Sequence, residues 1–330
     1  MSGGAACYIG LDVGGSTMKA GVVDDDGRRL GPPVSLPTEP ERGAQVGLER
    51  MCEAIREAAR AAGVGPERVA ALGVATPGLM DIPAGVILEA PNLGGWRDVP
   101  VRDHIRGVFG KPTAFQNDAN AAAYGEYWAG AGRTANSLVL LTLGTGIGGG
   151  IVVGGRGRGW VLEGEHSHAA EVGHIRIEMS NPRRCGCGRL GCLEAYASAP
   201  AVVRRAEEAL AGDGASALSV VLRRQGRLSA RDVFEAAAAG DPLAEGVVEE
   251  TARYLAVGTV NLMHTIDPDV VVYGGGMTAA GPGFLERVRR HVAELAFPVP
   301  AARTAIRYAE LGNDAGFVGA AGCARLLLRA

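Results

Sequence analysis

The sequence has almost no net charge and very little lysine. Its 330 residues include 33 basic and 36 acidic side chains, for a net charge of −3, and Lys19 and Lys111 are the only lysines. This balance disfavours a polyanionic partner, and an apolar content of 47% disfavours long disordered segments. We therefore expect no nucleic-acid partner. At roughly 100–200 residues per domain, the length predicts about two domains.

Long apolar runs and a signal peptide are missing as well. The longest uncharged stretch contains Ser137 to Gly155, which approaches the length of a membrane span, but seven of these 19 residues are glycine. Two buried strands around a loop are the better interpretation of this stretch. The start of the chain lacks the basic and apolar regions of a signal peptide. We therefore predict a soluble, cytoplasmic protein without a membrane partner.

Two common nucleotide-binding motifs are missing. The Walker pattern GxxxxGK[ST] does not occur, which excludes an ordinary P-loop. Gly144 to Gly149 matches the spacing GxGxxG, but the apolar residues Ile151 to Val153 follow it. A dinucleotide-binding fold needs a helix directly after that loop, whereas these residues predict a strand. A dehydrogenase is therefore disfavoured.

Glycine is abundant instead, with 51 residues that gather in clusters. The apolar run Cys7 to Val13 leads into the loop Gly14 to Thr17, and a second apolar run, Met18 to Val23, follows. The same order returns at Ser137 to Val153, around the loop Gly144 to Gly150. Two such hairpins predict a duplicated plan that faces one cleft, although two glycine hairpins can also be alike by chance.

The remaining pattern predicts strands and helices in alternation, which indicates the α/β class. Strands are expected at residues 69–74, 112–116, 270–273 and 304–308, and helices at 45–62, 119–128, 202–211, 230–239, 243–266 and 315–328. The segment 75–95 is rich in proline, glycine and asparagine and is expected to be a long loop.

The two glycine loops present backbone N–H groups and hydroxyls without bulky side chains, as phosphate-binding loops do. Asp12 ends the strand before the first loop, where its carboxylate could hold Mg²⁺ directly or through water. A turn-forming aspartate is the alternative. The predicted phosphate-binding residues are Gly14, Gly15, Ser16, Thr17, Gly144, Thr145 and Gly146.

Three cysteines lie within eight residues with the spacing C-x-C-x₄-C, which lacks one ligand for a tetrahedral zinc site. His174 is the best candidate for the fourth ligand. His166 and His168 are weaker candidates because they lie in a polar, glycine-flanked stretch. The expected ligands are His174, Cys185, Cys187 and Cys192. Four protein ligands leave no open position, so the zinc would be structural. A disulfide or three unligated thiols are the alternatives.

These motifs follow one another in a fixed order: the first loop, Asp118 after a strand, the second loop, Glu171-Val172-Gly173-His174, and the cysteine segment from Cys185 to Glu194. Together they resemble the ROK family (repressors, uncharacterised frames and sugar kinases), in particular its bacterial glucokinases. The resemblance covers about Tyr8 to Cys323. It implies an actin-like, hexokinase-like (ribonuclease H-like) pair of α/β domains that close on a cleft, and a homo-oligomer, either dimer or tetramer.

The same resemblance implies ATP-dependent phosphorylation of a hexose at its 6-hydroxyl, with glucose as the expected substrate. Asp118 would accept the hydroxyl proton, although the spacing alone suits a helix N-cap equally well. The sugar contacts that it implies are Gly78, Asn92, Asn117, Glu171, His174 and Glu194. Gly275 and Gly276 would form the adenosine-binding turn. ATP, Mg²⁺ and a structural Zn²⁺ are the expected cofactors.

The expected domain division follows the hairpins and the last helix. Residues 1–118, with roughly 315–330, are predicted to form a smaller N-terminal α/β domain. Residues 119–314 are predicted to form a larger C-terminal α/β domain that contains the zinc-binding loop 171–194. By fixing this loop, the zinc would turn His174 and Glu194 toward the sugar.

Some positions depart from the family pattern and leave alternatives open. Ser16 replaces a usual threonine and keeps the hydroxyl, whereas Ser167 and Ala170 replace glycines just before Glu-x-Gly-His. Kinases for N-acetylglucosamine, N-acetylmannosamine, allose or fructose share these motifs, and polyphosphate stays open as a donor. A sugar-sensing repressor is not expected, because the first loop begins by residue 14 and leaves no room for a DNA-reading domain.

Overall fold

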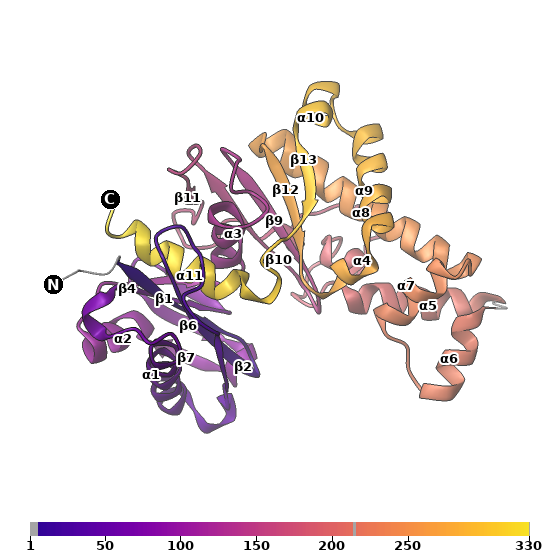
Figure 1. Cartoon of the computed structure of the whole chain (residues 1–330). Coiled ribbons are helices and arrows are strands. Elements are labelled where there is room, and N and C mark those ends of the chain that lie inside the picture. Colours follow the sequence, from indigo (N-terminus) through magenta and orange to yellow (C-terminus); the bar gives the residue numbers. More distant parts are fainter. Residues whose placement is uncertain (1–5, 214–215, 330) are drawn as a thin grey trace. The chain divides into compact units, whose positions relative to one another are not determined.

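The structure, a computed structural model, describes residues 6–213 and 216–329. Within these ranges strands and helices alternate along the chain (Figure 1), which confirms the predicted α/β class. Contacts divide the chain into two compact units. Unit 1 comprises Met1–Leu138, Gly150–Ala170 and Ala309–Ala330, and unit 2 comprises Val139–Gly149 and Glu171–Tyr308.

The first sheet belongs to unit 1 and has the strand order β3-β2-β1-β4-β8. Strands β1, β2 and β3 are antiparallel neighbours, whereas β4 is parallel to both β1 and β8. The carboxyl ends of β1, β4 and β8 therefore meet at one edge, which carries Asp12 and Asn117. The strands are β1 (Cys7–Val13), β2 (Thr17–Val23), β3 (Val34–Pro37), β4 (Val69–Thr76) and β8 (Thr113–Asn117).

Four helices complete unit 1. The apolar face of α1, which includes Met51 and Ile55, is buried in one core with Leu11 and Val13 of β1. Helix α11 packs against β1, β4 and α3. The helices are α1 (Ala44–Ala61), α2 (Val101–Phe109), α3 (Asp118–Trp128) and α11 (Ala315–Leu326), and the short 3-10 turns are η1 (Pro40–Arg42), η2 (Pro66–Arg68) and η6 (Gly312–Asp314).

Small residues allow α11 to lie directly on the sheet and on α3. A Cβ at Gly10 of β1 would lie 1.7 Å from the carbonyl oxygen of Phe317, and one at Gly319 would lie 1.6 Å from that of Ala121 in α3. Real Cβ atoms do not approach backbone so closely, so neither position has room for a side chain. Helix α11 thus fills a slot that only glycine leaves open.

The segment 75–95, predicted to be a loop, contributes to a three-stranded antiparallel sheet of order β5-β6-β7. That prediction is wrong because each strand is short, and turns of proline and glycine separate the apolar residues. Met80, Ile87 and Trp96 are nevertheless buried in the core of unit 1. The elements are β5 (Leu79–Asp81), β6 (Val86–Ala90), η3 (Pro91–Leu93) and β7 (Trp96–Val99).

The second five-stranded sheet has the order β11-β10-β9-β12-β13. As in the first sheet, a hairpin of consecutive strands is followed across the sheet by later strands, and the last pair, β12 and β13, is parallel. The matching orders agree with the duplicated plan that the hairpins predict. The strands are β9 (Leu138–Leu143), β10 (Ile147–Val153), β11 (Trp160–Val161), β12 (Val270–Gly274) and β13 (Ala305–Tyr308).

Helices dominate the rest of unit 2. The long helix α8 begins at the N-cap Asp241, whose carboxylate accepts from the N–H of Ala244 at 3.0 Å, and it packs against α5, α7 and α9. The helices are α4 (Glu194–Ala197), α5 (Ala199–Asp213), α6 (Ala217–Gln225), α7 (Ala230–Ala238), α8 (Pro242–Ile266), α9 (Pro282–Leu295) and α10 (Pro298–Arg303), with the 3-10 turns η4 (Val172–His174) and η5 (Gly276–Ala280).

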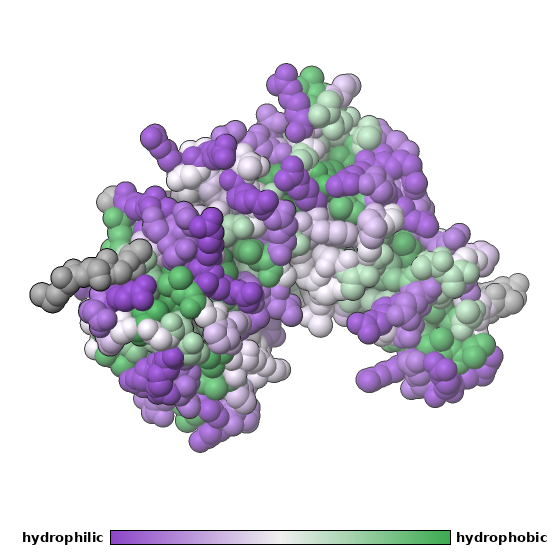
Figure 2. All heavy atoms as spheres, in the orientation of Figure 1, coloured by the Kyte–Doolittle hydropathy of each residue, from purple (hydrophilic) through white to green (hydrophobic). Residues whose placement is uncertain are grey.

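Figure 2 shows hydrophilic and hydrophobic side chains intermixed over its visible face. Among the helices in the described ranges, none is both long enough and apolar enough to span a bilayer.

Contacts group residues 119–138 with unit 1, since α3 packs on α11, whereas the larger domain is predicted to start at residue 119. That domain boundary stays a prediction.

Candidate active site and metal centre

The first glycine loop makes a tight turn at the end of β1. The N–H of Gly14 donates to the carbonyl of Thr17 at 2.9 Å, and the hydroxyl of Thr38 donates to the carbonyl of Gly14 at 2.7 Å. Ser16 and Thr17 are exposed. The turn therefore holds its backbone rigidly and leaves two hydroxyls accessible to a ligand, as a phosphate-binding loop requires.

Gly78 and Asn92 flank strands β5 and β6. Gly78 has φ +113°, and a Cβ there would lie 2.7 Å from the carbonyl oxygen of Glu89, so backbone packing alone requires glycine. Asn92 is exposed, and a Cβ at Gly15 would lie 3.0 Å from its carbonyl oxygen. The structure thus brings the predicted sugar contact Asn92 beside the first glycine loop.

Asp12 is a partly buried carboxylate at the carboxyl edge of the first sheet. Burial, followed by the negative charge of Asp118, raises its pKa to about 7, against the opposing effect of Lys19. Lys19 lies opposite Asp12 on β2, and its ammonium group is 2.6 Å from Asp314. A divalent cation would compensate for two nearby carboxylates at this edge, so the oxygen donors present fit Mg²⁺.

Asn117 and Asp118 form the corner between β8 and α3. The side-chain oxygen of Asn117 accepts from the N–H groups of Ala119 and Asn120 at 2.9 and 3.2 Å, so Asn117 is the N-cap of the helix. Its amide NH₂ remains the group that can donate to a sugar hydroxyl. Asp118 begins the helix and accepts from the N–H of Ala119 at 2.8 Å. The N-cap function that the spacing allowed for Asp118 therefore belongs to its neighbour.

In unit 2, the second glycine loop lines a cavity of about 540 Å³. The loop closes with a hydrogen bond of 3.0 Å from the N–H of Gly144 to the carbonyl of Gly146, and β10 starts directly after it, earlier than the sequence predicts. Gly275 has φ +86°, and a Cβ there would lie 2.4 Å from the carbonyl oxygen of Leu143. This close approach joins the ends of β9 and β12, so that Gly144, Thr145 and Gly276 line the same cavity.

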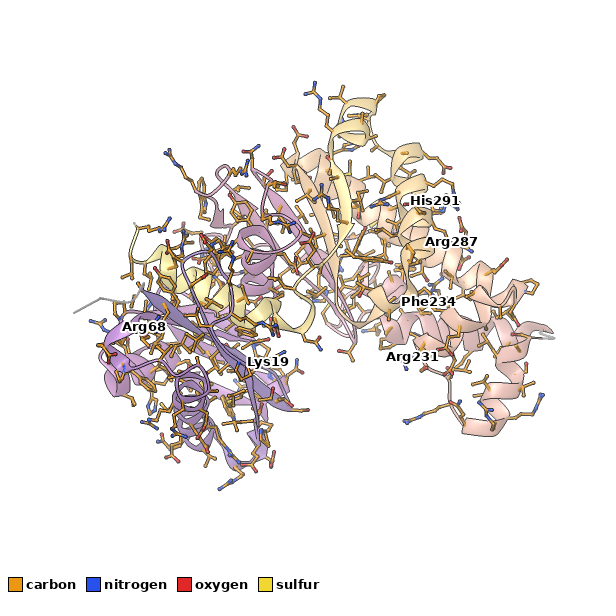
Figure 3. All side chains as sticks on the ribbon, in the orientation of Figure 1. Lys19, Arg68, Arg231, Phe234, Arg287 and His291 are labelled. Atoms are coloured by element: carbon orange, nitrogen blue, oxygen red, sulfur yellow. The ribbon has the colours of Figure 1, made fainter. Side chains whose placement is uncertain are left out.

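The other walls of this cavity were not predicted. Helix α7 contributes Arg231, Phe234 and Glu235, and η5 contributes Met277; Figure 3 labels Arg231 and Phe234. An aromatic ring in an apolar helix face cannot be told from a core residue by periodicity, and so no sequence signal identified Phe234. The cavity combines apolar walls with a glycine loop at its edge, which suits a nucleotide.

The four predicted zinc ligands come together in unit 2, where their ligand atoms all lie within 4.8 Å of one another. The Sγ of Cys185 is 3.8 Å from Nδ1 of His174, and the Sγ atoms of Cys187 and Cys192 are 3.7 Å apart. Zn–S bonds of about 2.3 Å place the corners of a tetrahedron about 3.8 Å apart. These distances fit zinc and are too long for a disulfide. The competitor His166 is exposed and outside the cluster.

The surroundings of the cluster shift the pKa values of its thiols. Burial raises the pKa of the Cys185 thiol to about 12, and burial likewise raises that of Cys192. The backbone N–H of Arg189 lowers the pKa of the exposed Cys187, and the guanidinium of Arg176 donates to the sulfur of Cys192. A divalent metal bound here would displace the thiol protons, because the thiolate is the form of cysteine that ligates a metal.

Glu194 connects this cluster to the second glycine loop. One carboxylate oxygen accepts from the N–H of Ile147 at 2.9 Å, and the other lies 3.3 Å from the Sγ of Cys185. The turn that carries Glu171 and His174 packs on the same strand, because a Cβ at Gly173 would lie 2.0 Å from the carbonyl oxygen of Ile147. The start of β10 thus gathers the predicted sugar contacts of unit 2.

The two departures from the family pattern retain a glycine-like backbone. Ser167 and Ala170 have φ values of 60° and 63°, in the left-handed region that non-glycine residues rarely adopt. The Ser167 hydroxyl accepts from the N–H of Ile82 at 3.0 Å. The loop therefore has a backbone conformation that glycine adopts readily, and the Ser167 hydroxyl adds a hydrogen bond to the turn after β5 that glycine could not supply.

The predicted site residues thus form two sets, one in each unit. Unit 1 carries Asp12, Gly14, Gly15, Ser16, Thr17, Gly78, Asn92, Asn117 and Asp118, and unit 2 carries Gly144, Thr145, Gly146, Glu171, His174, Cys185, Cys187, Cys192, Glu194, Gly275 and Gly276. Their individual functions stay predictions.

Comparison with known proteins identifies the family. The sequence pattern of the ROK family matches residues 8–326. A glucokinase of Halalkalibacterium halodurans is 36% identical over 94% of this chain and 93% of its own length. A ROK hexokinase from Thermus thermophilus has a TM-score of 0.82 and 38% identity, and the match covers 98% of this chain and 99% of that one.

A ROK family glucokinase from Streptomyces griseus, solved with glucose and AMPPNP, has a TM-score of 0.78 and 35% identity over 97% of this chain and 100% of its own. These two structures confirm the hexokinase-like α/β fold that the motifs imply. Both the sequence match and the structural matches extend over nearly the whole chain. The chain therefore belongs to the ROK family.

Proposed function

We propose that this protein is an ATP-dependent hexose kinase that phosphorylates the 6-hydroxyl of glucose. The observation that carries the proposal is the placement of Asp118 at the carboxyl edge of the first sheet, beside the partly buried Asp12 and at the start of the helix that Asn117 caps. The glucokinase relatives and the glucose complex of the Streptomyces griseus protein support glucose as the sugar.

In the proposed reaction, Asp118 accepts the proton of the 6-hydroxyl as that oxygen attacks the γ-phosphorus. A new O–P bond forms, the bond from the γ-phosphorus to the bridging oxygen of ADP breaks, and the products are hexose 6-phosphate and ADP. Asp12 would hold Mg²⁺, which supplies charge neutralisation on the phosphates when bound. Gly14 to Thr17 and Gly144 to Gly146 would position the phosphate oxygens through N–H groups and hydroxyls.

The sugar would be oriented by carboxylate, imidazole and amide groups from Asn92, Asn117, Glu171, His174 and Glu194. His174 presents Nδ1 to the cysteine cluster, which leaves Nε2 to meet a hydroxyl. A coupled assay with a panel of hexoses, and with ATP and polyphosphate as donors, tests this function. Turnover of N-acetylmannosamine or another hexose in preference to glucose would contradict glucose as the substrate but not the assignment as a sugar kinase. A homo-oligomer and a cytoplasmic location stay predictions.

The cavity of unit 2 leads to a prediction about the phosphoryl donor. Gly144 lines this cavity, and a Cβ there meets nothing within 4 Å. A leucine at this position can therefore be accommodated, but its side chain would occupy part of the cavity. We expect Gly144→Leu to raise the apparent KM for ATP at least about tenfold, or to abolish turnover, with glucose affinity unchanged. Initial rates over a range of ATP concentrations, with glucose binding measured by calorimetry, check this.

Gly283 in α9 is the matched control, because a Cβ there also meets nothing within 4 Å and the residue is exposed. Gly283→Leu should leave both KM values unchanged. Loss of glucose binding in Gly144→Leu, with normal ATP saturation, would contradict the donor assignment of the cavity.

The cysteine cluster leads to a prediction about metal. We expect one zinc per chain, held by His174, Cys185, Cys187 and Cys192. Cys187→Ser should lose the zinc, lower the melting temperature and raise the sugar KM much more than the ATP KM, because the metal fixes the segment that carries His174 and Glu194. Elemental analysis of protein purified without chelator, together with steady-state kinetics, measures both effects.

Cys52→Ala is the control, since Cys52 is buried in the core of unit 1, away from the cluster. It should lower the melting temperature but keep both the zinc and the sugar KM. Wild-type protein without zinc, or a Cys187→Ser enzyme with unchanged sugar affinity, would rule out the proposed zinc function.

A further inference from the structure

A buried glutamine stands directly before the catalytic corner. Gln116 is 3% exposed. Its side-chain oxygen accepts from the N–H of Asn117 at 2.8 Å and from the amide NH₂ of Asn120 at 3.2 Å. Its own NH₂ donates to Glu163 at 2.7 Å. Donors surround one end of this amide and an acceptor meets the other, so its orientation is fixed.

The partner of Gln116 begins the loop that precedes the Glu-x-Gly-His motif. The carbonyl of Glu163 accepts from the N–H of Ala169 at 3.0 Å, which closes the loop on itself. Within the loop, the Ser167 hydroxyl accepts from the N–H of Ile82. The carboxylate of Glu163 therefore projects from a segment that is itself anchored, and it can restrain what binds to it.

We propose that Gln116 and Glu163 form a positioning pair for Asp118. The pair holds the end of β8 by the Asn117 N–H and holds the first turn of α3 by Asn120, on either side of the base. This inference rests on the proposed function, in which Asp118 accepts the proton of the sugar hydroxyl.

The physical reason lies in how sensitive proton transfer is to distance. A general base must be within about 2.6–3.2 Å of the proton donor, and a misplacement of about 1 Å can cost a hundredfold in rate. Asp118 lies where strand β8 ends and helix α3 begins. Asn117 on one side of it and Asn120 on the other both donate a hydrogen bond to the side-chain oxygen of Gln116. A fixed amide at Gln116 therefore determines the position of the Asp118 carboxylate. The residues proposed to bind ATP do not depend on this amide.

The decisive experiment inverts the pair. Gln116→Glu places a second carboxylate against Glu163 in a buried site, where two like charges repel strongly. At mildly alkaline pH we expect kcat to fall at least about tenfold, with the ATP KM within about twofold of wild type. Adding Glu163→Gln in the same chain restores one amide and one carboxylate with their order reversed. The double variant should recover kcat to within about threefold of wild type.

Gln116→Met is a second variant, which removes the same hydrogen bonds without burying a charge. It should also lower kcat, and Glu163→Gln should not rescue it. The matched control is Gln45→Glu, because Gln45 donates to Glu49 at 3.2 Å in the same amide–carboxylate arrangement on the exposed side of α1. This control should keep the wild-type kcat. Melting temperatures of all variants are measured beside the rates, so that an unfolded variant is recognised.

The outcomes separate this inference from the function on which it rests. If Gln116→Glu and Gln116→Met keep kcat within about twofold of wild type, or if the inverted pair is as slow as Gln116→Glu alone, the positioning pair is refuted. If Asp118→Asn remains active, the assignment of the base fails instead. An inactive Asp118→Asn beside a fully active Gln116→Met overturns the positioning inference alone.

Discussion

Replacing Asp118 by asparagine should lower kcat by about 10²- to 10⁴-fold, the usual contribution of a positioned general base. Asparagine keeps the size of the side chain and the oxygen that accepts from the N–H of Ala119, so α3 should start as before. The amide cannot take up the proton of the 6-hydroxyl. The protein should therefore fold, bind glucose and bind ATP while the phosphoryl transfer almost stops.

Steady-state rates, glucose calorimetry and a thermal melt together measure this effect. Asp103→Asn is the control, since Asp103 is an exposed carboxylate on α2 of the same unit. It should retain the wild-type kcat. If purified Asp118→Asn kept even a third of wild-type kcat, Asp118 would not be the base.

Adding a single methyl group at Gly319 should unfold unit 1 or destabilise it by at least about 3 kcal/mol, at the upper end of overpacking costs. A Cβ there would lie 1.6 Å from the carbonyl oxygen of Ala121 in α3, and backbone cannot yield as a flexible side chain does. The helical preference of alanine over glycine, about 1 kcal/mol, acts in the opposite direction and is too small to compensate.

Gly246→Ala in α8 provides the matched comparison, because a Cβ at Gly246 meets nothing within 4 Å. This substitution should raise stability by roughly 0.5–1 kcal/mol. Urea unfolding of both variants measures the difference. A Gly319→Ala protein as stable as wild type would show that α11 can move away from α3 at little cost.

The parts of the candidate site that could be predicted from the sequence lie in short segments. The spacing of Cys185, Cys187 and Cys192 predicts a shared metal, and the structure places them with His174 in one cluster. The corner at Asp118 and both glycine loops also follow from short segments, because a strand, a turn and the next element are local features. The types and the spacing of these residues indicate their chemistry before their positions in space are known.

Residues that act through distant partners could not be predicted. Gln116 and Glu163 are 47 positions apart, and nothing in either segment indicates the other. Phe234 and Arg231 line the cavity of unit 2 from a helix whose pattern is that of ordinary packing. The small sheet β5-β6-β7 was missed for a different reason, since its strands are shorter than the window that periodicity needs.

The slot that α11 occupies has a consequence for the order in which the protein is made. The ribosome produces β1, β4 and α3 first, then nearly all of unit 2, and only afterwards the helix that covers them. At about 5–20 residues per second, the early strands must wait on the order of ten seconds or more for this helix. During that interval the glycine-lined face of β1 and α3 lacks its covering helix, so unit 1 cannot complete its packing until the end of the chain has been made.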